Sequence, residues 1–278
     1  MVLDPLRTNE LNSAIHKVVK KGDVVCDIGA GLGLLSYFAL SAGAKFVYAI
    51  DCDNESLSLA ADHARKHGLS DKIAFIEGHS ADVHLPEKVD VIICETIGSA
   101  AFDENILAAL SDAKKRFLKP GGKIIPSTVE LWGAPTTFPS PPVGEGRGEG
   151  DIGIQTSSVR ANNLLCEPQR LAQINTTGKF GSKNHLRHTF KIQKSGKFRG
   201  MAIWPKIEWA KGFATDASPL KPLTHWKQCV LPDKKRMVKA GDCLKFELII
   251  RPNIANPKEQ TEILWKIVPS FVRRGKGR

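Results

Sequence analysis

The chain has 278 residues, of which 25% are charged and 42% hydrophobic, as in ordinary globular proteins. No apolar run approaches the roughly 18 to 20 residues that cross a bilayer, and no charged-then-apolar leader opens the sequence, so a membrane or secreted protein is not expected. The six cysteines form no C-x-x-C pair, which argues against a zinc site and a disulfide framework. We therefore expect a cytoplasmic protein with reduced thiols and no bound metal.

Charge divides the chain into two unequal parts. Residues 1–133 hold 14 Lys/Arg against 18 Asp/Glu, a net charge of −4. The remaining residues hold 26 against 11, a net charge of +15. The sign changes near Trp132, where the sequence pattern also changes. We interpret residues 1–132 and 133–278 as two domains with different electrostatic tasks.

The first domain alternates short apolar strands with helical patterns. Strands are expected over residues 23–29, 45–51, 72–78, 89–95 and 123–131, with a turn at 119–122, and helices over 32–43, 54–68 and 103–118. Continuous apolar strands separated by helices predict a parallel sheet covered on both faces. In such sheets, ligands bind beyond the C-terminal strand ends, near the point where the strand order reverses.

The first two strand ends carry a nucleotide-type pattern. The segment "CDIGAGLG" places Gly29, Gly31 and Gly33 where a sharp turn lets a ligand approach the backbone. Asp51 ends the second strand, where an acid can accept hydrogen bonds from both ribose hydroxyls of an adenosine. The glycines alone also fit a tight turn without a ligand. Together with Asp51 they favour an adenosine cofactor, and the G-x-G-x-G spacing makes NAD or FAD the less favoured choice.

Two acids surround a small loop after the strand at residues 89–95. Glu95 and Glu104 stand nine positions apart, with Gly98 and other small residues between them. Acids at a strand end are usually solvated loop residues, and the spacing alone does not exclude that reading.

Ordered motifs along the chain resemble those of known methyltransferases. "CDIGAGLG" resembles motif I of class I S-adenosylmethionine-dependent methyltransferases. "MVLDPLRT", "CETIGSAAFDEN" and "THWKQ" resemble three motifs of the protein arginine methyltransferases: the N-terminal segment, the double-E loop and the THW loop. The resemblance covers nearly the whole chain. It implies an α/β fold, with a Rossmann-like class I methyltransferase domain of mostly parallel sheet followed by a β-barrel-like domain. It also implies S-adenosyl-L-methionine as cofactor and arginine in protein substrates as methyl acceptor.

The resemblance assigns roles in the reaction. Glu95 and Glu104 are expected to clamp the substrate guanidinium, which leaves one terminal nitrogen nucleophilic and aligned with the sulfonium methyl. His225 is expected to orient an acid or relay the released proton. Trp226 is expected to pack against the guanidinium or to exclude water. Taken alone, "THW" reads more readily as a strand-end aromatic beside a satisfied histidine.

Cofactor contacts follow from the same resemblance. The candidates are Arg7, Asp27, Gly29, Ala30, Gly31, Asp51, Ser80 and Ala81. Arg7 would contact the cofactor carboxylate, although an arginine near a terminus is more often solvated. Many members of the family have a Glu where this chain has Ala81, so a contact there would come from the backbone. Asp82 is a candidate substitute.

Two family segments lack a clear counterpart. The aromatic Y-F-x-x-Y segment would lie upstream of Met1, and the only tyrosines, Tyr37 and Tyr48, fall in the sheet domain. We expect an upstream extension, a different closure of the site, or a weak or inactive protein. Residues 139–160, which are rich in Pro, Gly and Ser, stand in place of the dimerisation arm and are typical of a flexible insert. The sequence therefore leaves homodimerisation open.

The second domain reads as β structure. Alternating or aromatic runs predict strands over residues 185–193, 199–210, 227–232, 244–253 and 261–270, with a basic connection at 233–242 and a basic tail at 272–278. Nucleic acid or a ribonucleoprotein is a candidate partner, with solvated surface as the alternative. The basic residues concerned are Lys234, Lys235, Arg236, Arg273, Arg274, Lys276 and Arg278.

Two alternatives to a protein arginine methyltransferase stay open. One is a methyltransferase of a small guanidino or amine metabolite. The other is a catalytically weak relative that acts as a binding module. The intact pair Glu95 and Glu104 argues against the second alternative, whereas the missing aromatic segment favours it.

Overall fold

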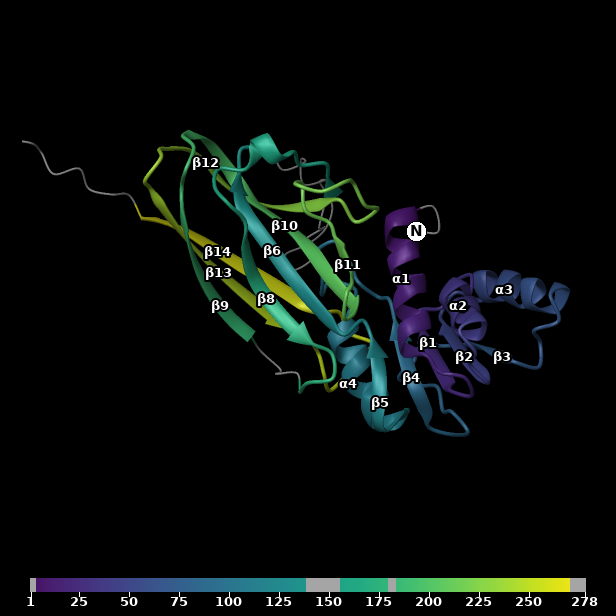
Figure 1. Cartoon of the computed structure of the whole chain (residues 1–278). Coiled ribbons are helices and arrows are strands. Elements are labelled where there is room, and N and C mark those ends of the chain that lie inside the picture. The colour runs from purple at the N-terminus through teal and green to yellow at the C-terminus, as the bar shows by residue number, and fades with distance from the viewer. Residues whose placement is uncertain (1–3, 139–155, 180–183, 271–278) are drawn as a thin grey trace, which may run out of the picture.

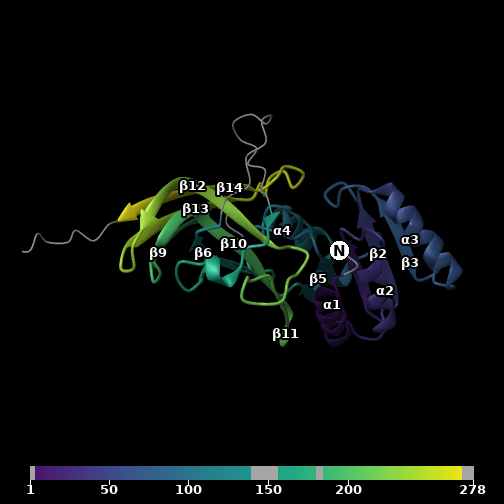
Figure 2. The same ribbon diagram turned by 90° about the horizontal axis from the view of Figure 1, so that it is seen from above.

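The computed structural model describes residues 4–138, 156–179 and 184–270, and the chain forms two units that lie side by side (Figure 1). One unit is a parallel sheet with helices on both faces, and the other is built from antiparallel strands. Figure 2, seen from above, shows α1 and α2 on one side of the parallel sheet and α4 on the other. No helix within the described ranges is long and apolar enough to span a membrane.

The first unit is a five-stranded parallel sheet in the order β3-β2-β1-β4-β5. Its strands are β1 (Val24–Ile28), β2 (Phe46–Asp51), β3 (Ile73–Glu77), β4 (Val89–Cys94) and β5 (Leu118–Ile125). Its helices are α1 (Pro5–Val18), α2 (Leu34–Ser41), α3 (Asn54–Lys66) and α4 (Ile106–Arg116). The strand order reverses between β1 and β4, so the loops that follow these two strands meet at one edge.

Helix α1 has no counterpart among the elements expected from the sequence. The signal was nevertheless present, because Asp4 followed by Pro5 is a typical helix start. Asp4 is the N-cap residue and accepts a hydrogen bond from the backbone N–H of Arg7 at 3.1 Å. Leu11, Ala14 and Ile15 are fully buried, and the helix packs against α2 of the first unit and against β10 and β11 of the second.

Residues 123–131, expected as a single strand, divide between the two units. Strand β5 ends at Ile125, and Pro126 cannot donate a hydrogen bond to continue the ladder. Strand β6 (Thr128–Thr136) instead pairs with β8 and β10 of the second unit. The chain therefore changes sheets within two residues, and the boundary expected near Trp132 falls inside β6. The turn expected at 119–122 forms part of β5.

The second unit consists of two antiparallel sheets around a shared core, in agreement with the expected barrel-like domain. One sheet has the order β7-β12-β10-β6-β8 with β11 on β10, and the other has the order β14-β13-β9. Besides β6, its elements are β7 (Thr156–Ser157), the 3-10 helix η1 (Ala161–Asn163), β8 (Gln169–Asn175), β9 (Asn184–Lys191), β10 (Gly196–Ala210), β11 (Phe213–Asp216), β12 (Gln228–Val238), β13 (Cys243–Arg251) and β14 (Glu262–Ser270).

Strand β12 is longer than the sequence suggests, because the expected connection at 233–242 is largely strand. β12 continues past Pro232, and its partner strand β10 accommodates this with a register shift beside Gly200. A Cβ at Gly200 would lie 2.2 Å from the carbonyl oxygen of Leu231, so only glycine fits there. The basic residues Lys234 and Lys235 are thus part of the strand rather than of a loop.

The end of the expected flexible insert at 139–160 is also ordered. Thr156 and Ser157 form β7, which pairs with β12, and the N–H of Val159 donates to Gln228 Oε1 at 3.0 Å. Val159 is buried, which explains why this end is fixed. Residues 139–155 and the basic tail at 272–278 lie outside the described residues.

Candidate active site

A cleft of about 290 Å³ lies at the edge of the parallel sheet where the strand order reverses. The loops after β1, β2, β3 and β4 form its walls, as the strand order predicts. Five residues predicted from the sequence line it: Gly29, Asp51, Ser80, Glu95 and Glu104. Ile28, Ile50, Cys52, Gly78, His79, Thr96, Asn105, Ala109 and Pro257 complete the lining.

The glycine-containing loop after β1 is hydrogen-bonded to the end of β2. The N–H groups of Gly29 and Ala30 donate to the carbonyl oxygen of Ile50 at 2.9 and 3.1 Å. Gly29 has a φ of +76°, which strains any residue with a side chain. A Cβ there would also lie only 2.9 Å from Thr96 Cγ2. The N–H of Gly31 donates to Asp51 Oδ2 at 2.7 Å. This hydrogen bond links the ends of β1 and β2, where the sequence predicts the adenosine site.

Asp27 is a buried carboxylate with one unsatisfied oxygen. Its Oδ2 accepts a hydrogen bond from Ser36 Oγ at 2.7 Å, whereas its Oδ1 has no partner in the described part of the chain. Burial raises the pKa of Asp27 to about 6, although the hydrogen bond from Ser36 opposes this. A buried acceptor without a donor is costly, so this atom suits a ligand that brings a donor. The sequence did not point to Ser36.

The loop after β3 is hydrogen-bonded to Arg116 of α4. Arg116 donates to the carbonyl oxygens of Ser80 and Val83, and it also pairs with Asp112. Ser80 is buried in the cleft wall. The N–H of Ala81, expected to face a cofactor, is instead 3.2 Å from His79 Nδ1. Neither Arg116 nor His79 was singled out by sequence reasoning.

Asp82, the suggested substitute for the family's Glu, points elsewhere. Its Oδ2 pairs with Lys258 Nζ at 2.7 Å, and both side chains are more than half exposed. Asp82 is not among the residues that line the cleft.

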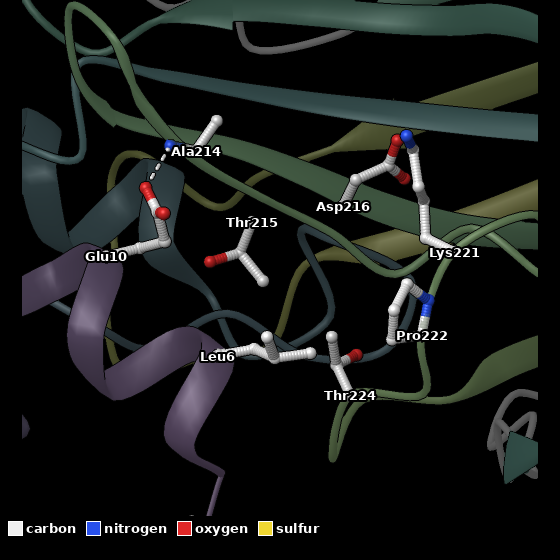
Figure 3. Close-up of a pocket in the computed structure, with 8 residues that line it drawn as sticks. All are labelled: Leu6, Glu10, Ala214, Thr215, Asp216, Lys221, Pro222 and Thr224. Carbon is white, nitrogen blue, oxygen red and sulfur yellow. Dashed lines mark hydrogen bonds between the residues drawn. The ribbon is translucent and has the colours of Figure 1, made fainter.

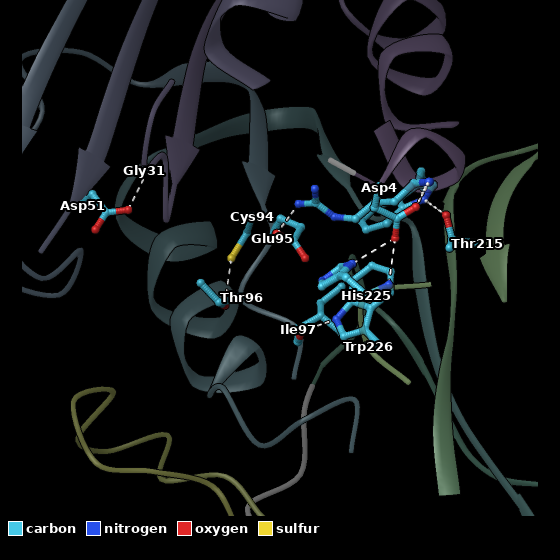
Figure 4. Close-up of polar contacts among 12 residues, drawn as sticks. Asp4, Gly31, Asp51, Cys94, Glu95, Thr96, Ile97, Thr215, His225 and Trp226 are labelled. Atoms are coloured by element: carbon cyan, nitrogen blue, oxygen red, sulfur yellow. Dashed lines mark hydrogen bonds and ion pairs between the residues drawn. The ribbon is translucent and has the colours of Figure 1, made fainter. Parts of the chain in front are cut away.

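Glu95 directly follows β4 (Figure 4). It forms a buried ion pair with Arg7 of α1. Each of the two side chains is only 5% exposed. Burial raises the pKa of Glu95 to about 7; Arg7 opposes this rise, while Glu104 and Asp27 add to it. The second acid, Glu104, lines the same cleft, and its pKa is raised by desolvation and by neighbouring Asp103. The structure therefore brings the two predicted acids to one cleft.

The loop between the acids requires its glycine. A Cβ on Gly98 would lie 2.3 Å from Asp103 Oδ1, because the loop folds back onto that carboxylate. Asp103 Oδ1 accepts a hydrogen bond from the N–H of Ala100 at 3.0 Å. Ala101 and Asn105 have φ values of +66° and +68°, so the chain turns sharply within the loop and again at its end. The small residues noted in the sequence are what make this compact turn possible.

His225 is anchored to the start of α1 through Asp4. Asp4 Oδ2 lies 3.0 Å from both the backbone N and the ring Nδ1 of His225. Burial lowers the pKa of His225, with partial compensation from Asp4, so the imidazole is neutral at neutral pH. Burial tends to raise the pKa of Asp4, but hydrogen bonds from His225 and Arg7 outweigh it and the pKa is lowered. Asp4, which sequence reasoning missed, is therefore the carboxylate beside this histidine.

Trp226 fastens the barrel to the double-acid loop. Its Nε1 donates to the carbonyl oxygen of Ile97 at 2.6 Å, and Ser99 Oγ donates to the carbonyl oxygen of Trp226 at 2.8 Å. The centroids of the Trp226 and His225 rings are 4.1 Å apart. The guanidinium carbon of Arg7 lies 5.8 Å from the centroid of the Trp226 ring. Trp226 is only 2% exposed, and it is not among the residues that line the cleft.

A second cavity, of about 230 Å³, lies beside the first turns of α1 (Figure 3). Leu6 and Thr224, the neighbours of Arg7 and His225 in the sequence, form part of its wall. The hydroxyl of Thr224 is buried and has no partner within the described ranges. Among the described residues, no group of three or more His, Cys, Asp or Glu is arranged to hold a metal ion.

Comparison with known proteins links both halves of the chain to methyltransferases. Residues 8–129 match the family described as Ribosomal protein L11 methyltransferase (PrmA), and residues 153–267 match the Arginine methyltransferase oligomerization subdomain. Protein arginine N-methyltransferase 6 of Danio rerio is 31% identical over 267 residues, which cover 83% of this chain and 74% of that protein. The chain belongs to the protein arginine N-methyltransferase family.

Other members of the family match over different lengths. Probable protein arginine N-methyltransferase 6 of Arabidopsis thaliana is 41% identical over 141 residues, but these cover half of this chain and only 32% of that protein. The chain thus spans about a third of the length of that relative. The solved Trypanosoma brucei PRMT1 enzyme–prozyme heterotetrameric complex with AdoHcy has a TM-score of 0.80 at 22% identity, covering 97% of this chain and 92% of that chain. This likeness confirms the expected fold.

Proposed function

We propose that the protein is an S-adenosylmethionine-dependent methyltransferase that modifies arginine in protein substrates. The observation that carries the proposal is the pair of acids on one cleft, with Glu95 held by Arg7 and Glu104 facing the same space. The glycine loop and Asp51 lie in that cleft too, so the sites for an adenosine and for a guanidinium adjoin. Family membership supports the same activity.

The residues in and directly behind the cleft lining fit S-adenosylmethionine. Asp27 Oδ1 and Arg7 Nε are buried polar atoms without partners in the described chain, and they suit the ammonium and carboxylate groups of a methionine. Asp51 suits the ribose, and Gly29 leaves room for close approach to the backbone. When bound, the cofactor supplies a sulfonium methyl group, which is the reactive part of the chemistry.

The acids would hold and polarise the substrate arginine. Arg7 occupies Oε2 of Glu95, which leaves Oε1 without a hydrogen bond in the described structure. The positive charge of Arg7 also favours the ionised form of Glu95, which a guanidinium needs as an acceptor. Glu104 offers a second carboxylate from the other end of the loop. Two fixed acceptors set the plane of the guanidinium and leave one terminal nitrogen unpaired, so most of the rate enhancement comes from orientation.

His225 would receive the proton that the nitrogen loses. Its lowered pKa keeps the ring neutral at neutral pH, and Asp4 accepts the Nδ1–H hydrogen bond. That hydrogen bond makes Nε2 the basic nitrogen and stabilises the imidazolium that forms after transfer. Asp4 also caps α1, so the same carboxylate connects the histidine to the helix that carries Arg7.

Mass spectrometry of substrates incubated with methyl-labelled cofactor tests the proposal. We expect label on arginine side chains of arginine-rich proteins or peptides, and loss of label in the Glu104→Gln variant. Glu10→Gln is a suitable control, because Glu10 lies on α1 outside the cleft. Label only on small guanidino or amine compounds would favour the metabolite alternative. Peptide binding without any label would favour the binding module.

A further inference from the structure

The loop that joins β13 to β14, residues 252–261, reaches from the second unit to both walls of the cleft. Pro257 is part of the cleft lining. Lys258 pairs with Asp82 on the loop after β3, with Nζ and Oδ2 2.7 Å apart. The same β13–β14 loop contacts the opposite wall through Asn105, the residue that directly follows Glu104. It therefore touches the adenosine side and the acid side of the cleft at once.

Asn105 gives both of its side-chain groups to this loop. Its Nδ2 donates to the carbonyl oxygen of Pro257, and its Oδ1 accepts a hydrogen bond from Thr261 Oγ1 at 2.9 Å. Thr261 is 7% exposed, so the hydroxyl and the amide oxygen meet in a largely buried place. These partners stand more than 150 positions away from Asn105 in the chain.

The conformation of Asn105 is unusual for its place at the start of α4. An Asn at a helix N-cap normally has extended backbone and bonds its side chain to the first turn. Asn105 instead has a φ of +68°, and its side chain makes no hydrogen bond to the helix. Its side chain therefore binds the second unit and does not cap α4.

Glu104 has no comparable anchor of its own. Within the described residues its carboxylate makes no hydrogen bond or ion pair, whereas the other acid, Glu95, is fixed by Arg7. The backbone of Glu104 is set by the tight turn before it and by Asn105 after it. Any shift of Asn105 moves Glu104 directly.

We propose that the β13–β14 loop positions Glu104 for the reaction, with Asn105 and Thr261 as positioning residues. The inference rests on the proposed function, because it assigns Glu104 to the substrate guanidinium. The second unit thereby fixes one acid of the pair, while α1 of the first unit fixes the other. Misplacement of a catalytic group by about 1 Å can lower the rate about a hundredfold. Loss of the hydrogen bonds that Asn105 makes to Pro257 and Thr261 should therefore lower the rate of methyl transfer.

Two substitutions at Thr261 separate the hydroxyl from the shape of the side chain. Thr261→Val removes the donor to Asn105 at nearly constant volume, and Thr261→Ser keeps it. We expect kcat/KM for an arginine peptide to fall by about tenfold or more in Thr261→Val, with cofactor affinity unchanged, and to stay within about threefold in Thr261→Ser. Thr189→Val, the same change at an exposed position of β9, is the matched control.

A second variant guards against misfolding at Thr261. Asn105→Gly tolerates the positive φ but removes both hydrogen bonds, so its expected loss is at least as large as that of Thr261→Val. Normal kinetics in both Thr261→Val and Asn105→Gly would overturn the proposal. So would an equal loss in Thr261→Ser and Thr261→Val, because the hydroxyl would then be irrelevant.

Hydrogen exchange provides a readout that does not depend on turnover. Backbone amides of residues 98–106 should exchange faster in Thr261→Val than in the parent protein or in Thr261→Ser. Unchanged exchange there would refute the positioning role even in an active enzyme. If the parent protein methylates no arginine but the exchange rates differ as expected, the proposed function fails while the link between the β13–β14 loop and the Glu104 segment stands.

Discussion

Replacing Arg7 by Gln should shift the acidic limb of the pH–rate profile to higher pH. The pKa of Glu95 is about 7, so in the parent protein roughly half of this carboxylate is ionised at pH 7 and about a tenth at pH 6. Because only the ionised form brings the negative charge that pairs with a guanidinium, kcat/KM should fall at least about tenfold for each pH unit below 7. The pKa of Asp27 is about 6 and that of His225 is lowered, so neither titrates above Glu95.

The size of the shift follows from the burial of the ion pair. Both side chains are 5% exposed, so water screens their attraction only weakly. A neighbouring opposite charge typically lowers a carboxyl pKa by about 1 to 3 units, and the loss of Arg7 should raise that of Glu95 by a similar amount. With a pKa of about 8 or more, the ionised fraction at pH 7 falls about fivefold or further. The deficit should shrink as the pH rises.

The assay measures kcat/KM for an arginine peptide between pH 5.5 and 9.5, at a cofactor concentration at which further addition does not raise the rate. That condition matters because Arg7 is also a candidate cofactor ligand. Arg7→Lys retains the positive charge and should keep its acidic limb close to that of the parent protein. An acidic limb of Arg7→Gln at the parental pH or below would show that Arg7 does not control the ionisation of Glu95.

Four further outcomes are expected. Glu104→Gln should lower the rate of methyl transfer by about a hundredfold or more, whereas calorimetry should find the cofactor affinity nearly unchanged. Asp51→Ala should have the opposite effect, because its first consequence is a weaker cofactor affinity in calorimetry. Gly200→Ala should reduce the free energy of unfolding in urea by about 1 to 3 kcal/mol, because its Cβ would overlap a carbonyl oxygen of the adjacent strand. The hypothesis of a nucleic-acid partner predicts that RNA is retained in filter binding at low salt, and that neutralising Lys234 and Lys235 together weakens this retention and reduces its salt dependence. The absence of filter binding to RNA at low salt would leave these residues as solvated surface.

The sequence predicted those parts of the site that lie next to a strand end. Gly29, Asp51 and Glu95 each follow directly from an apolar run or close one, so the parallel order of the strands brought them to a single cleft. The side-chain pairs that hold the site together were not predictable in this way. His225 meets Asp4 across 221 positions, and no periodicity relates two such residues.

Helix α1 illustrates the same limit at the level of the fold. Its cap signature was present in the sequence, but its apolar face is narrow and its buried residues pack partly against a different unit. The length of β12 was misread for a related reason. A proline and a run of basic residues suggested a connection, whereas a register shift in the neighbouring strand allowed pairing to continue.

The continuity of the hydrophobic core has a consequence for protein engineering. Buried side chains form one cluster that includes residues of both units, α1 packs against β10 and β11, and only Pro126 and Ser127 separate β5 from β6. A chimera that exchanged the barrel unit for that of a homologue would therefore replace half of an interior rather than an attached module. Such exchanges should succeed only when α1 and the barrel strands beneath it are transplanted together, so substrate preference is better altered by point changes at the cleft than by recombining halves.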